Sequence, residues 1–297
     1  MSTPGFNPNL MIGPLILGNT LSSVLFGILT LQTYLYYGNF PNDPRRNKIA
    51  VAAVWILECG HFICTFVETW IDAVTHFGEI TIYFLIPRVL AVSLLIAGLV
   101  LSIFTLMFAD RIYRMSNNKY IFVFLCIASA VRLLASTANY IAIWRSEDIL
   151  EYLDRWNWAI PAQLGLGLLT DLVITLSLVI YLKKQNRTMN HSTMRIVDTL
   201  VWWSIESGCS TVVLGIATLL TMIYLPHTYI WISMLLIITR VYSNVLLASL
   251  NGRAKLRALK RTSVILSTDP QFPTEAPSHG DIYLMTASKA SVSAQAI

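Results

Sequence analysis

Charged residues are scarce in this sequence. Only 12% of its 297 residues are Asp, Glu, Lys or Arg, about half the share found in a typical soluble domain. Apolar residues make up 55% of the chain, and the formal net charge is +5. This composition excludes a soluble enzyme, a disordered protein and a nucleic-acid-binding protein, and it predicts a polytopic membrane protein.

Cysteine pairs and catalytic motifs are also missing. The four cysteines lie within apolar runs, with neither the spacing of a metal site nor a disulfide framework. The sequence has no His-Glu-x-x-His, Gly-x-Ser-x-Gly or phosphate-loop motif. We therefore expect no catalytic residue, no cofactor and no metal site, and we predict that the protein is not an enzyme. A membrane hydrolase built from Glu58, His61 and Asp171 is a minor alternative.

What the sequence does contain is long apolar runs. A membrane-spanning helix needs about 20 mostly apolar residues. Seven segments qualify, so we predict an all-α integral membrane protein with a bundle of seven transmembrane helices. The predicted spans are residues 11–37, 49–74, 83–109, 120–144, 158–182, 196–225 and 228–250. Residues 1–10 form a short extracellular N-terminus, 251–261 a basic juxtamembrane segment, and 262–297 a disordered cytoplasmic tail rich in Ser, Thr, Pro and Ala.

The basic residues predict the orientation of the spans. Fifteen Lys and Arg residues lie in the loops and juxtamembrane segment on one side, and only Arg145 and Arg155 lie on the other. Basic loops stay in the cytoplasm, so the N-terminus is predicted outside and the C-terminus inside, in the plasma membrane or an endomembrane. The sequons at Asn186 and Asn190 fall in a predicted cytoplasmic loop, and we expect neither to be glycosylated.

Five ionisable residues lie deep in the predicted spans. A charge within the membrane costs roughly 2.5–3.5 kcal/mol on insertion scales, so each one needs an explanation. At about 1.5 Å per residue, all five lie roughly 15–20 Å from the cytoplasmic face. They either pair across helices and fix the bundle, or form a proton, solute or ligand site; both interpretations stay open. The residues are Glu58, Arg132, Asp171, Glu206 and Arg240.

Polar residues also recur at helical spacing within single spans. The second span has five on one face, and the fourth and seventh spans have similar stripes. Such stripes face protein or water, and they predict a cavity open to the outside and lined by acidic residues of the second span. The alternative is a set of interhelical hydrogen-bond seams. The candidate polar network is Glu58, His61, Glu68, Asp72, Arg132, Asn139, Asp171, Glu206, Arg240 and Asn244.

Several motifs together resemble a known family. They are residues 13–15 (Gly-Pro-Leu), 32–37 (Gln-Thr-Tyr-Leu-Tyr-Tyr), 205–208 (Ile-Glu-Ser-Gly) and 240–251, which begins Arg-Val-Tyr-Ser-Asn. This pattern resembles the fungal seven-span family defined only as domain of unknown function 6534. The resemblance covers about residues 11–255 and implies a multi-pass membrane protein without an assigned activity or ligand.

Known seven-span classes fit poorly. The last predicted span has no lysine for a retinal Schiff base and no Asn-Pro-x-x-Tyr motif. We therefore expect a receptor-like or sensor protein with an outward-facing polar cavity. The first alternative is a secondary transporter that uses Glu58, Asp171 and Glu206, and the second is a non-catalytic structural protein. The expected partners are the lipid bilayer, an unidentified small ligand and an unidentified cytoplasmic protein. We expect no nucleic acid to bind.

Overall fold

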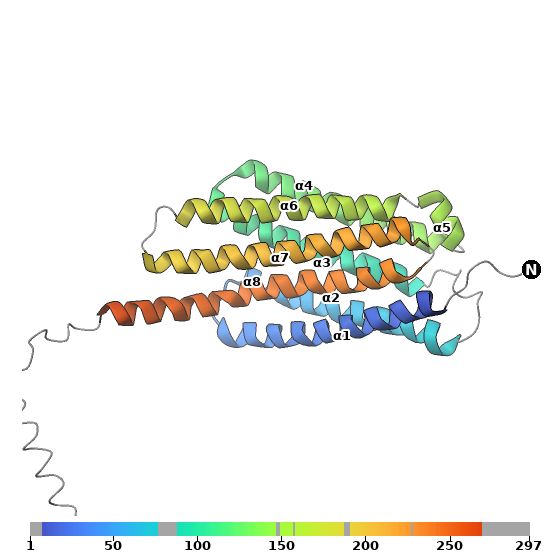
Figure 1. Ribbon diagram of the computed structural model, residues 1–297, viewed down its shortest axis with the longest axis horizontal. Helices are drawn as coiled ribbons and strands as arrows, with labels where there is room; N and C mark the ends of the chain where they lie inside the picture. Colours follow the sequence, from blue (N-terminus) through green and yellow to red (C-terminus); the bar gives the residue numbers. More distant parts are fainter. Residues whose placement is uncertain are drawn as a thin grey trace, which may run out of the picture. The chain divides into compact units, whose positions relative to one another are not determined.

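The regular structure in the described part of the chain is entirely helical (Figure 1). The computed structural model describes residues 8–76, 88–146, 149–156, 158–186, 191–226 and 228–268. The helices are α1 (Pro8–Asn39), α2 (Arg45–Trp70) with a π-helical turn (Ile71–Thr75), α3 (Arg88–Ser116), α4 (Lys119–Arg145), α5 (Ile149–Trp156), α6 (Ala159–Asn186), α7 (His191–Tyr224) and α8 (Ile230–Thr268). Residues 1–257 form one compact unit and 258–297 another, of which only the C-terminal turns of α8 are described.

Within the described residues, six helices are long and apolar enough to cross a membrane. They are α1, α2 with its π-helical turn, α3, α4, α6 and α8. Within α7, the segment Gly208–Tyr224 is apolar but shorter than a full span. Large apolar side chains also point outward: Leu17, Leu134 and Val213 are 64–69% exposed. An apolar outer surface of this kind suits lipid, so the protein is membrane-embedded.

Local sequence explains where the helices end. After α1, Pro41 and Pro44 remove backbone donors and restrict the preceding residues, so the chain turns before α2 begins at Arg45. Between α3 and α4, Asn117 adopts a positive φ of 52°, which Asn tolerates better than most residues. The next residue, Asn118, caps α4 because its side chain accepts a hydrogen bond from the Tyr120 amide at 2.9 Å.

Helix α8 is the most deeply packed of the six candidate spans. In its most apolar stretch 61% of the residues are buried, against 28–39% in the other five. It contacts α1 closely, since a β-carbon added to Gly18 would overlap Ser233. The same is true where Gly98 of α3 meets Ser136 of α4. Small residues permit such close approach where lipid gives no hydrophobic driving force.

Some helix bounds differ from the predicted spans. Residues 83–87 of the third predicted span lie outside the described residues. Helix α5 lies in a segment predicted as a loop; its apolar residues 149, 150, 152, 153 and 156 recur at helical spacing. Helix α8 continues to Thr268, through the basic segment and into the predicted tail. In the basic segment this is favoured because Ala, Leu, Lys and Arg are strong helix formers.

Candidate functional site

One buried ion pair joins α8 to α2. Arg240 and Glu58 are both fully buried, and Nη1 of Arg240 donates to the Glu58 carboxylate and to its backbone oxygen, the latter at 2.9 Å. Nε of Arg240 donates to the Ser22 hydroxyl of α1 at 3.1 Å, and the Ser243 hydroxyl donates to the other carboxylate oxygen. Three helices therefore meet at one charge pair. We name Ser22, Glu58, Arg240 and Ser243 the paired cluster.

Two asparagines extend this contact along α1. Asn244 donates to the backbone oxygen of Leu25 at 3.0 Å, and Asn251 donates to that of Gln32 at 2.8 Å. The donors and the acceptors are each seven residues apart, which is about two helical turns. This part of the predicted seventh-span stripe is therefore a hydrogen-bond seam between α1 and α8.

A second cluster lies on the opposite side of α8. Tyr242 donates to Oδ2 of Asp171 on α6, and Cζ of Arg132 on α4 lies 5.9 Å from the centre of the Tyr242 ring. Residues two positions apart on a helix face roughly opposite directions, so Tyr242 points away from the paired cluster. Within the described residues, Nε and Nη1 of Arg132 and Oδ1 of Asp171 are buried without a hydrogen-bond partner. We name Arg132, Asp171 and Tyr242 the open cluster.

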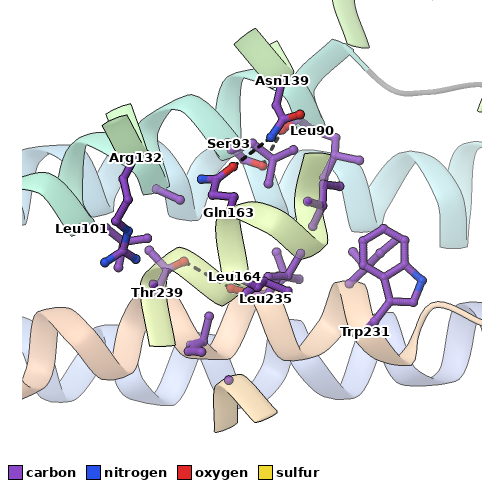
Figure 2. Close-up of a pocket in the computed structure, with 18 of the residues that line it drawn as sticks. Leu90, Ser93, Leu101, Arg132, Asn139, Gln163, Leu164, Trp231, Leu235 and Thr239 are labelled. Atoms are coloured by element: carbon purple, nitrogen blue, oxygen red, sulfur yellow. Dashed lines mark hydrogen bonds between the residues drawn. The ribbon is translucent and has the colours of Figure 1, made fainter. Parts of the chain in front are cut away.

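A cavity of about 110 Å³ adjoins the open cluster (Figure 2). Its lining comes mainly from α3, α4, α6 and α8 and is mostly apolar; the polar lining residues include Arg132, Asn139 and Gln163. Figure 2 shows Arg132 at one end of the lining and Trp231 at the other. The arrangement can hold a small, largely apolar molecule with a hydrogen-bond acceptor near Arg132.

A series of hydrogen bonds links polar side chains along one side of this cavity. Tyr152 of α5 donates to Oδ1 of Asn139 at 3.2 Å, Asn139 donates to Gln163 at 2.8 Å, and Gln163 donates to Ser136 at 2.6 Å. Burial raises the pKa of Tyr152 to about 12, which keeps its hydroxyl protonated as a donor. These hydrogen bonds join α5, α4 and α6. The polar groups of Tyr152, Asn139 and Gln163 that take part in them bind one another, so they are already satisfied within the protein.

The remaining predicted site residues do not lie together in the structure. His61 lines the cavity, and its buried Nδ1 has no hydrogen-bond partner in the described part of the chain. Glu58, Glu68 and Asp72 are buried but lie outside the cavity lining. The side chain of Glu206 lies outside the described residues. Among the described residues, no group of three or more His, Cys, Asp or Glu side chains could hold a metal ion.

Several residues of this region were not among the predicted site residues, and four of them have large polar or aromatic side chains. They are Tyr152, Gln163, Trp231 and Tyr242. The amphipathic pattern of residues 149–156 is a signal that could have found Tyr152. Gln163 is an amide within an apolar run, which is a weaker signal of the same kind. Trp231 and Tyr242 have no local signal, since aromatic residues are common in spans.

These features define a membrane-embedded protein, helical throughout its described elements, with a mostly apolar cavity and two buried charge clusters. Residues 167–255 match the model of a family of unknown function, DUF6534. The match includes Asp171 and the α8 residues of the two clusters and of the hydrogen-bond seam with α1, and it supports the resemblance to this family over this part of the chain. No curated protein and no solved structure has a significant match.

Proposed function

We propose that this protein is a receptor-like or sensor protein with seven spans, whose cavity binds a small, mainly apolar ligand bearing a hydrogen-bond acceptor. The observation that supports this most is Arg132, a buried guanidinium at the end of an apolar cavity, with two nitrogens that lack acceptors among the described residues. An unsatisfied buried donor costs roughly 1–3 kcal/mol, more when it is charged. An acceptor on a ligand would remove that cost.

The distribution of charge supports an outward-facing cavity. Helix α5, which contributes Tyr152 to the lining, follows α4 in the segment that the count of basic residues places outside. In this proposal α7 is the sixth of seven spans, the N-terminus is outside and the C-terminus is cytoplasmic. In the same proposal, the resemblance to the fungal family extends over residues 11–255. The protein then acts by binding a ligand and not by catalysis.

A secondary transporter is the second candidate. Of the three carboxylates that the sequence offered for it, Glu58 already pairs with Arg240. Asp171 is buried, and one of its oxygens has no hydrogen-bond partner among the described residues; it also lines a separate small cavity with Thr175 and Thr211. Such a carboxylate could exchange a proton. Solute uptake into proteoliposomes driven by a pH gradient, abolished by Asp171→Asn, would favour this function.

Binding is tested with short apolar acids. We expect butanoate, octanoate or benzoate, or their methyl esters, to raise the melting temperature of the detergent-purified full chain, because a ligand that binds only the folded state stabilises it. Arg132→Met should remove this increase. Arg145→Gln, an exposed arginine on the same helix, is the matched control and should keep it. No stabilisation of the wild type by any of these probes, or an equal loss in both variants, would contradict the proposal.

A second variant tests the same site with a smaller change. A β-carbon added at Gly167, which also lines the cavity, would lie 3.2 Å from Nη2 of Arg132. Gly167→Ala should therefore displace the guanidinium by a few tenths of an ångström and weaken binding. Gly27→Ala on α1 is the control, since nothing lies within 4 Å of its added carbon.

A further inference from the structure

A second cavity lies at the other end of the bundle from α5. It has a volume of about 390 Å³ and lies between α2, α3, α6 and α8. By the count of basic residues, this end of the bundle faces the cytoplasm. The cavity is separate from the one lined by Arg132 and has a different character, because guanidinium groups dominate its polar lining.

Positive charge is in excess in this cavity. Four arginines line it (Arg46, Arg111, Arg114 and Arg253), against one lining carboxylate, Asp110. Asp110 accepts two hydrogen bonds from Arg46, at 2.6 and 2.5 Å, and one from Arg114 at 2.9 Å. Asp43, next to the cavity, accepts two from Arg253 at 3.0 and 2.8 Å. Counting both aspartates, two positive charges are not compensated.

Arg111 is the arginine without an acidic partner. Its Nη1 donates to the Ser249 hydroxyl of α8 at 2.5 Å, and within the described residues it forms no ion pair. A half-buried guanidinium held by one neutral hydroxyl keeps most of its donors for an anion. Arg46 and Arg114 line the same cavity, and both donate hydrogen bonds to Asp110. An anion bound by Arg111 would therefore lie in a cavity lined by the guanidinium groups of all three arginines.

We propose that this cavity binds a phosphate-bearing group, either the headgroup of an anionic phospholipid or a soluble phosphate ester. A phosphate monoester has three acceptor oxygens and a charge near −2, which matches several arginine forks better than a single carboxylate does. Apart from Asn47 and Ser249, the rest of the lining is apolar and comes from α3, α6 and α8, which suits the glycerol and first acyl carbons of a lipid. Basic pockets between spans on the cytoplasmic side are known to bind such headgroups.

Native mass spectrometry of the detergent-purified full chain tests the site. The probes are short-chain phosphatidylinositol bisphosphate, short-chain phosphatidylcholine and free inositol trisphosphate. We expect the bisphosphate lipid to bind more tightly than phosphatidylcholine, and Arg111→Gln to weaken that binding about tenfold, because it removes a charge-assisted hydrogen bond. If inositol trisphosphate competes, the phosphates alone suffice; if it does not, the site is specific for the lipid. Both outcomes support the proposal.

The control is Arg45→Gln. Arg45 is exposed at the same end of α2 and does not line the cavity, so binding should stay unchanged. If Arg111→Gln fails to fold, Arg114→Gln replaces it, since that side chain is 67% exposed; we expect a loss of several-fold. Equal binding of phosphatidylcholine, or an equal loss in Arg45→Gln and the cavity variant, would mean that the basic surface as a whole attracts lipid, and the proposal would be wrong.

Discussion

Two arginines in the interior of the bundle differ in how their charge is compensated. Arg240 in the paired cluster donates to a carboxylate, a backbone oxygen and a hydroxyl, and one of its nitrogens, Nη2, has no partner among the described residues. Arg132 in the open cluster has two such nitrogens, Nε and Nη1, and forms no ion pair with a described residue. Both residues are buried. The difference indicates that Arg240 holds helices together, while Arg132 is kept in place at a cost to stability. Residues kept at such a cost are often functional.

Breaking the paired cluster should have the largest effect. Glu58→Gln removes the acid that compensates Arg240 and should destabilise the protein by about 3–5 kcal/mol, because a buried charge is left without its partner. Thermal unfolding in detergent should show a sharply lower melting temperature. The double variant Glu58→Gln with Arg240→Met should recover part of this loss. An unchanged melting temperature for Glu58→Gln would remove the contrast between the two clusters.

Arg132→Met should have a smaller effect, and of opposite sign. It replaces an incompletely paired buried guanidinium by a shorter, flexible apolar side chain, so stability should stay the same or rise by about 1–3 kcal/mol. Arg240→Met is the matched comparison and should lower the melting temperature, since it leaves Glu58 without its cation. If both variants lose stability equally, Arg132 has a structural role like that of Arg240.

The smallest effect is expected at the pair of Asp43 and Arg253, at the end of the bundle. Burial by itself would raise the pKa of Asp43, but hydrogen bonds from Arg253, Tyr36 and Asn47 outweigh it and hold that pKa well below its usual range. Because the folded-state pKa is the lower one, the stabilisation is complete above the unfolded value of about 4 and is lost as the pH falls below it.

Asp43→Asn should therefore lower stability by about 1–2 kcal/mol at neutral pH. The melting temperatures of the variant and the wild type should converge as the pH is lowered below about 4. A gap that stays constant across this range would show that ionisation of Asp43 does not stabilise the fold.

Much of the fold could be predicted because its signals are local. The run of apolar residues in each candidate span, the prolines between α1 and α2, and the basic residues at helix ends can each be read within a few turns of chain. Helix α5 was missed because the segment is short and amphipathic, and such a segment can equally be a loop between two spans.

The site was only partly predictable. Arg132, Asn139 and Asp171 were identified because polar residues are rare within spans, and the structure brings Arg132 and Asn139 to the cavity lining with His61. Glu68 and Asp72 have the same sequence signal and lie elsewhere. The spacing of residues along one helix shows which side chains share a face, but it does not show which neighbouring helix that face meets.

The sequence by itself determined a series of apolar helices and the positions of Arg132 and Arg240 within them, because hydropathy and helical spacing are properties of neighbouring residues. Only the tertiary structure decided the partner of each arginine. Arg240 meets Glu58 across 182 positions of sequence, while Tyr242, two residues away, meets Asp171 on the opposite side of α8. The long-range packing of α8 pairs Arg240 with a carboxylate, and it leaves Arg132 at a cavity with two nitrogens that have no acceptor among the described residues.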